Sequence, residues 1–192
     1  LAGALACYEE ALAIYRETGN HQLAAAILGN LAATAMDLGD LPRARALAEE
    51  GVAALRATGD RRSLADCLHT ASRVAYLQGD LERARDGLFE SLALCEETEY
   101  PSGVANALLT LGYVTAAEGR PARAACLLAA AERVREQVRS ALSAAEQTRL
   151  EEASGRLRTE LGADAFAAQQ AAARAAPWPR LLQYVRGGTE EL

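Results

Sequence analysis

The chain has 192 residues, of which 51% are hydrophobic and 24% charged, and this is enough apolar material to bury a core. The 20 basic residues are all arginine and face 26 acidic ones, so the net charge of −6 argues against a surface that grips nucleic-acid phosphates. No apolar run reaches the ~18 residues of a membrane-spanning helix, and no signal-peptide pattern opens the sequence. We therefore expect a cytoplasmic protein with no direct nucleic-acid or membrane contact.

The sequence repeats itself with a period of 40 residues and no gaps. Apolar residues recur at helical spacing in each half of the period, which predicts two helices of about 17 residues per repeat. We predict a half repeat at 1–20, whole repeats at 21–60, 61–100 and 101–140, and a separate C-terminal segment at 141–192.

Turn residues separate the predicted helices at regular intervals. Gly39, Gly79 and Gly119 close the first helix of each repeat, where the chain needs a positive φ angle. Asp40 and Asp80 follow as N-caps of the second helix. One column of the repeat is invariant and small, which predicts close packing of the two helices rather than chemistry. It contains Ala4, Ala44, Ala84 and Ala124.

The C-terminal segment predicts helices that cover the last apolar face of the repeat array. Ser143 and Glu146 form a capping box that opens a helix reaching Leu161. Asp164 is predicted to cap the next helix, and the Pro–Trp–Pro sequence at 177–179 is predicted to break the chain before a short turn at 180–185.

The paired helices, the turns GDLPRAR (39–45) and GDLERAR (79–85), and the small residue in the second helix resemble tetratricopeptide repeats. The resemblance implies an all-α fold, a right-handed α-solenoid of antiparallel helical hairpins with C-terminal capping helices. It also implies a non-catalytic module that binds a protein or peptide in a concave groove lined by the first helices.

The C-terminal residues point to a particular group of proteins with such repeats. Residues 121–192, with AAAERVRE (129–136), LGADAF (161–166) and AAAR (171–174), are similar to the C-terminal end of large bacterial regulators. Those proteins join a STAND-type ATPase core to a repeat sensor and often to a LuxR-like DNA-binding domain. The resemblance implies the sensor region of a transcriptional or signalling regulator. A stand-alone scaffold that bridges proteins and a small-molecule sensor are the alternatives.

The predicted groove carries amide, aromatic, acidic and basic side chains that suit a partner segment. The candidate residues are Asn30, Met36, Asp66, His69, Arg73, Tyr76, Asn106 and Tyr113. The partner is expected to be a protein segment, including other domains of the same full-length protein. The uncovered helix at 1–18 further predicts self-association.

The sequence offers no convincing catalytic or metal site, and we predict no enzyme activity and no cofactor. Cys67 and His69 are two residues apart on one helix and point about 200° from each other, so they cannot easily share a metal. The acidic pairs, such as Glu49 with Glu50, are interpreted as solvated helix faces. The four cysteines, Cys7, Cys67, Cys95 and Cys126, occupy apolar positions and are expected to be buried.

Overall fold

The computed structural model describes residues 2–187, which form ten α-helices and no strand. The predicted all-α fold is confirmed. The chain divides into two compact units, Leu1–Gly103 and Val104–Leu192, and each is described by itself. No helix within residues 2–187 combines the length and the apolar character needed to cross a lipid bilayer.

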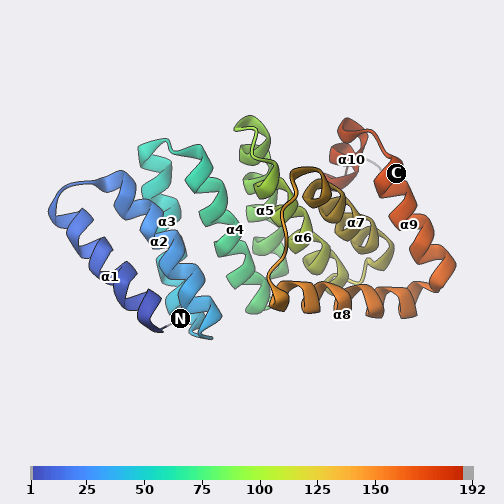
Figure 1. Cartoon of the computed structure of the whole chain (residues 1–192), viewed down its shortest axis with the longest axis horizontal. Coiled ribbons are helices and arrows are strands. Elements are labelled where there is room, and N and C mark those ends of the chain that lie inside the picture. Colours follow the sequence, from blue (N-terminus) through green and yellow to red (C-terminus); the bar gives the residue numbers. More distant parts are fainter. Residues whose placement is uncertain (1, 188–192) are drawn as a thin grey trace. The chain divides into compact units, whose positions relative to one another are not determined.

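The first unit is a succession of helices joined by tight turns, the stacked hairpins of an α-solenoid (Figure 1). The first helix of each repeat packs against the second helices on both sides, and α2 also packs directly against α4. The five helices are α1 (Ala2–Glu17), α2 (His21–Asp37), α3 (Leu41–Thr58), α4 (Arg61–Leu77) and α5 (Leu81–Glu97).

The same turn recurs between these helices because the same residue types recur. Asp40 accepts a hydrogen bond from the backbone N–H of Arg43 at 3.2 Å, and Asp80 accepts one from that of Arg83 at 3.1 Å. Gly39 and Gly79 precede them with φ of 82°, a left-handed conformation that residues with a Cβ rarely adopt. The predicted capping is confirmed at these turns.

The alanine column is buried in three of its four members. Ala44, Ala84 and Ala124 are fully buried. Ala44 lies in an apolar cluster with Met36 of α2 and Val74 of α4. Ala4 is exposed, so the packing role predicted for it is wrong. The reason is that α1 packs mainly against α2 and reaches α3 through ion pairs, whereas α3 packs against both α2 and α4.

The second unit is built around a buried helix. After α6 (Pro101–Ala117), which crosses the boundary between the units, come α7 (Pro121–Val138), α8 (Ala144–Leu161), α9 (Ala163–Ala175) and α10 (Trp178–Val185). Every residue from 124 to 131 of α7 is buried, and both α8 and α9 pack against this helix. In Figure 1, α8 runs crosswise to α7 and α9.

Two C-terminal boundaries differ from the prediction. Ser143 and Glu146 form the expected capping box, but Gly162 rather than Asp164 occupies the N-cap of α9. The last helix begins at Trp178 rather than at residue 180, with Pro177 at the N-cap and Pro179 inside the first turn. Proline is tolerated there because the first turn of a helix needs no N–H donor.

Candidate functional site

One face of α4 presents a row of polar side chains that neighbouring helices leave at least partly open. Arg62 and Asp66 are exposed, whereas His69, Arg73 and Tyr76 are half-buried. These residues are spaced four, three, four and three apart, so they lie along a single face of the helix. Their apolar counterparts on the other side of α4, such as Leu64 and Leu68, are buried in the core. The row is therefore the solvent edge of an amphipathic first helix.

Asp66 belongs to a small polar cluster with Arg62 and Tyr100. The Arg62 guanidinium lies over the Tyr100 ring, 4.1 Å from its centroid. The Tyr100 hydroxyl donates a hydrogen bond to the Asp66 carboxylate. Burial of the carboxyl group raises the pKa of Asp66, against the hydrogen bond from Tyr100 and the charge of Arg62, although the residue as a whole stays exposed. The cluster thus holds a carboxylate beside a cation and an aromatic ring.

The structure distributes the predicted groove residues unevenly. Asn30 of α2 is exposed, and the four candidates on α4 lie in the row just described. Met36 is 5% exposed and belongs to the cluster with Val74, so its predicted place on an open face is wrong. Its position falls where α4 covers α2, which the spacing within α2 alone could not show.

The two candidates on α6 belong to the second unit. Asn106 is half-buried, and its Oδ1 atom accepts a hydrogen bond from Arg135 of α7 at 2.6 Å. Tyr113 is 8% exposed and interacts electrostatically with the same Arg135. The predicted exposure of Tyr113 is therefore wrong, because the tyrosine lies in the core of its unit beside α7 rather than at an open face.

A feature that the sequence reasoning missed links the second helices of successive repeats. Glutamate and arginine side chains form ion pairs between α1 and α3, and again between α3 and α5, and each pair spans 34 residues of the chain. We call these four contacts the ladder. They are Glu9–Arg43, Glu49–Arg83, Arg16–Glu50 and Arg56–Glu90.

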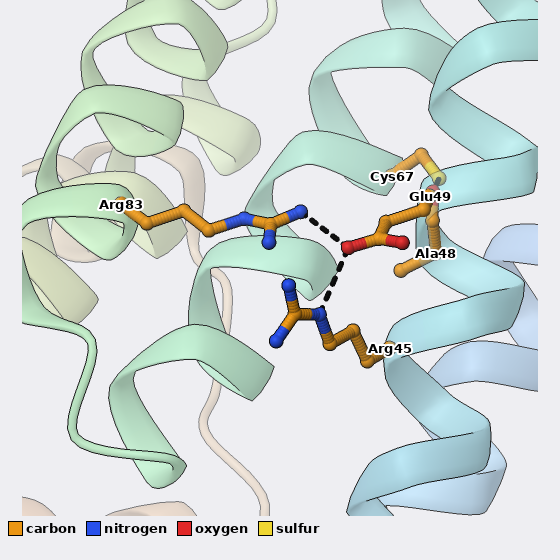
Figure 2. A network of polar contacts seen from close by, with 5 residues as sticks. All are labelled: Arg45, Ala48, Glu49, Cys67 and Arg83. Carbon is orange, nitrogen blue, oxygen red and sulfur yellow. Dashed lines mark hydrogen bonds and ion pairs between the residues drawn. The ribbon is translucent and has the colours of Figure 1, made fainter.

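The signal for the ladder was present in the sequence. The Glu9–Arg43 pair recurs 40 residues later as Glu49–Arg83, and Arg16–Glu50 recurs as Arg56–Glu90. Aligning the repeats and searching for opposite charges in fixed columns finds both. The interpretation of the acidic residues as helix faces paired four residues apart is incomplete, because of the ladder residues only Glu49 makes such a contact, with Arg45 at 2.9 Å. Figure 2 shows Arg45 and Arg83 converging on the Glu49 carboxylate. These two hydrogen bonds lower the pKa of Glu49 below its ordinary value.

The cysteines are mostly unreactive core residues. Burial raises the pKa of the Cys67 thiol to about 12 and those of Cys95 and Cys126 to about 11. Such thiols are not nucleophiles at neutral pH. Cys7 is exposed, so its predicted burial is wrong. Within residues 2–187, no group of three or more acidic, histidine or cysteine side chains is placed to hold a metal ion.

The sequence profile of the family described as tetratricopeptide repeat matches residues 1–57 and, in an overlapping second match, residues 23–97. Together the matches span α1 to α5, the helices that carry the row on α4 and the ladder. No curated protein matches the sequence.

Proposed function

The chain belongs to the tetratricopeptide repeat family, and from that premise we propose that it is the interaction region of a cytoplasmic bacterial signalling or transcriptional regulator. Repeats of this family generally mediate protein–protein interaction and are typically non-catalytic. The similarity of residues 121–192 to the C-terminal end of such regulators supports the regulator assignment. We retain residues 1–140 as the repeat array and residues 141–192 as its cap.

We further propose that a partner segment binds along the solvent edge of the first helices, with the row on α4 at its centre. The observation that carries this proposal is the cluster of Arg62, Asp66 and Tyr100 at the edge of α4. It combines a cation, a carboxylate and an aromatic ring, which can each contact a peptide backbone or side chain. Asn30 of α2 extends the polar surface onto the neighbouring first helix.

Site-specific photocrosslinking in the full-length protein tests this proposal. A photoreactive residue at position 69, within the row, should crosslink to one defined peptide, identified by mass spectrometry. The same residue at Ala46, an exposed position of α3, should not crosslink to that peptide. A peptide from another part of the same protein favours the regulator, whereas a peptide from a separate protein favours the scaffold. Equal crosslinking at the two positions contradicts the proposed face.

A conservative variant sharpens the test. Asp66→Asn removes the negative charge but keeps an oxygen that can accept the hydrogen bond of Tyr100. We expect this variant to fold as the native chain does and to lose most of the crosslink at position 69. Unchanged crosslinking would show that the carboxylate does not contribute to binding.

A further inference from the structure

A cleft of about 670 Å³ opens in the first unit where α3 and α5 flank α4. Its floor is apolar and small, with Val52 of α3, Leu68 and Ala71 of α4, and Gly87 of α5, and the exposed Ala53 of α3 lies at its edge. Its rim is charged, and includes Glu49 and Arg56 of α3 and Arg83, Asp86 and Glu90 of α5. The cleft opens between the second helices α3 and α5 over Leu68, Ala71 and Ser72 of α4, and it shares no residue with the row proposed above, so the two are separate sites.

The cleft exists because one repeat has two small residues where its neighbours have leucine. Ala71 stands where the neighbouring repeats have Leu31 and Leu111, and Gly87 stands where they have Leu47 and Leu127. Around α2, the matching leucines pack into one apolar cluster with Leu12 and Leu28, between α1 and α3. The repeat at 61–100 therefore leaves open a space that the preceding repeat fills.

Gly87 also brings α5 close to α4. A Cβ atom at this position would collide with the Oγ atom of Ser72. Ser72 is itself nearly fully buried and donates a hydrogen bond to the backbone oxygen of Leu68 at 2.8 Å. The matching residue in the preceding repeat is Ala32. The three departures, at 71, 72 and 87, are thus one coordinated change of packing at the cleft.

The rim carries more negative than positive charge. Its five carboxylates face two guanidinium groups, and the ladder already commits those two to Glu49 and Glu90. Asp80 caps α5. Glu82 and Asp86 remain on one face of α5, four residues apart, with Arg85 lying 3.6 Å from Asp86. Arg85 offsets one of these two negative charges, so one further cation from a partner, placed between Glu82 and Asp86, would neutralise the pair.

We propose that this cleft binds a basic segment of a protein partner. An aliphatic side chain of the segment fills the space above Ala71 and Gly87, and a neighbouring lysine or arginine pairs with Glu82 and Asp86. The apolar floor supplies affinity through buried area, and the acidic rim selects the sign of the partner's charge.

NMR titration with a defined probe tests the proposal. The probe is a synthetic peptide of glycine and serine with one central leucine between two pairs of lysines. We expect its addition to shift the backbone amide signals of Ala71, Ser72 and Gly87. A peptide with serine in place of leucine, or with glutamates in place of lysines, should leave these signals unchanged. Absence of shifts at the cleft up to the solubility limit of the lysine–leucine peptide overturns the proposal.

Filling the cleft provides the decisive variant. The triple change Ala71→Leu, Ser72→Ala and Gly87→Leu copies Leu31, Ala32 and Leu47 of the preceding repeat, so the protein is expected to fold with an unchanged or higher melting temperature. Loss of the buried leucine contact should weaken peptide binding by roughly tenfold or more. If the triple variant folds and binds the peptide as tightly as the native chain, the cleft is not the site.

A charge variant keeps the proposal falsifiable even if the triple variant fails to fold. Glu82→Gln with Asp86→Asn changes exposed side chains, and should weaken binding by roughly threefold to tenfold in low salt. Glu160→Gln with Asp164→Asn, at exposed positions of the second unit, is the matched control and should bind normally. Equal loss in both double variants would show that net charge, not the rim, attracts the peptide, and would overturn the proposal. The row variant Asp66→Asn should leave peptide binding unchanged, which separates this site from the one proposed above.

Discussion

Glu99 and Arg139 adopt left-handed backbone conformations, with φ of 49° and 54°, where the earlier repeats have Gly19 and Gly59. A residue with a Cβ atom is disfavoured in this conformation by about 1–2 kcal/mol, whereas glycine loses some of that advantage through its freer unfolded chain. Glu99 and Arg139 nevertheless adopt the left-handed conformation, because the helices on each side of these turns are held in place by their packing in the repeat.

Glu99→Gly is therefore predicted to stabilise the protein. We expect the free energy of unfolding to rise by about 0.5–1 kcal/mol, measured by urea denaturation. Gly59→Ala, the reverse change in the equivalent turn, should lower it because Gly59 has a φ of 75°. A Glu99→Gly variant that unfolds at the same or lower urea concentration contradicts the strain argument.

Ala84 is the residue at which packing between the paired helices is most easily tested. It is fully buried, so a larger side chain has no free space to enter. We expect Ala84→Leu to destabilise the protein by about 1–3 kcal/mol, seen as a lower melting temperature. The control is Ala46→Leu on an exposed position of α3, which should change the melting temperature little. Similar losses in both variants would contradict the packing role of the column.

At the scale of helices, the ladder makes a pH-dependent contribution to stability. The pKa of Glu49 is lower in the folded protein than its ordinary value of 4.5, first because Arg45 and Arg83 donate hydrogen bonds to its carboxylate. The stabilisation of the folded protein by the Glu49 ion pairs is therefore complete at pH values above the pKa of Glu49 in the unfolded chain. It is lost as the pH falls through the lower pKa of Glu49 in the folded protein. Because the pair is exposed, its worth is only a few tenths of a kcal/mol.

NMR titration of the Glu49 carboxyl carbon checks this prediction. The midpoint should lie below the ordinary value of 4.5 in the native protein and should rise in Arg83→Gln. High salt should also raise it, since screening weakens exposed ion pairs. A midpoint that is the same with and without Arg83 would show that the contact does not persist in solution.

Two arginines of α7 hold the C-terminal ends of the last helices. Arg133 donates hydrogen bonds to the backbone oxygens of Ala173 and Ala176 at 3.0 and 2.7 Å, at the end of α9. Arg123 donates one to the backbone oxygen of Val185 at 3.0 Å and lies over the ring of Tyr184 in α10. The last carbonyls of a helix have no partner within it and carry partial negative charge, so a guanidinium both satisfies and neutralises them.

Arg133→Met is predicted to lower the free energy of unfolding by about 1–3 kcal/mol, because a part-buried hydrogen-bonding donor is lost while the aliphatic stem is kept. Urea denaturation monitored by the fluorescence of Trp178 measures the loss in the second unit. Arg149→Met, at an exposed position of α8, is the control and should have little effect. Unchanged stability of the Arg133 variant would contradict the proposed capping.

At the scale of the whole molecule, the sequence predicts well those features that recur with the 40-residue repeat. The repeat fixes the helix lengths, the caps at Asp40 and Asp80, and the small column at Ala44, Ala84 and Ala124, because each depends on residues within one turn or one hairpin. The predicted exposure of Met36 and Tyr113 is wrong because a residue's burial depends on which neighbouring helices cover it as well as on its position in its own helix. The cleft forms where Ala71 and Gly87 replace leucines of the neighbouring repeats. This difference can be found only by comparing the repeats column by column.

Self-association through α1 is the last prediction, and it follows from the same column comparison. Ile14 is 50% exposed, whereas the matching residues of later repeats, Ala54 and Leu94, are half-buried and Val134 is 6% exposed. In later second helices, neighbouring helices cover this column. A second copy of the chain that packed on α1 would bury Ile14, which is worth about 1.5–3 kcal/mol for a fully covered side chain.

Sedimentation velocity across a range of protein concentrations measures the association. We expect the average mass to rise with concentration in the native chain and to stay near that of a monomer in Ile14→Asp. Leu77→Asp alters an equally exposed aliphatic residue at the end of α4 and should associate as the native chain does, because that position is not part of α1. If Leu77→Asp abolishes association equally, general surface hydrophobicity is the cause. A native chain that stays monomeric at its highest attainable concentration shows that the exposed face of α1 does not attract a second copy.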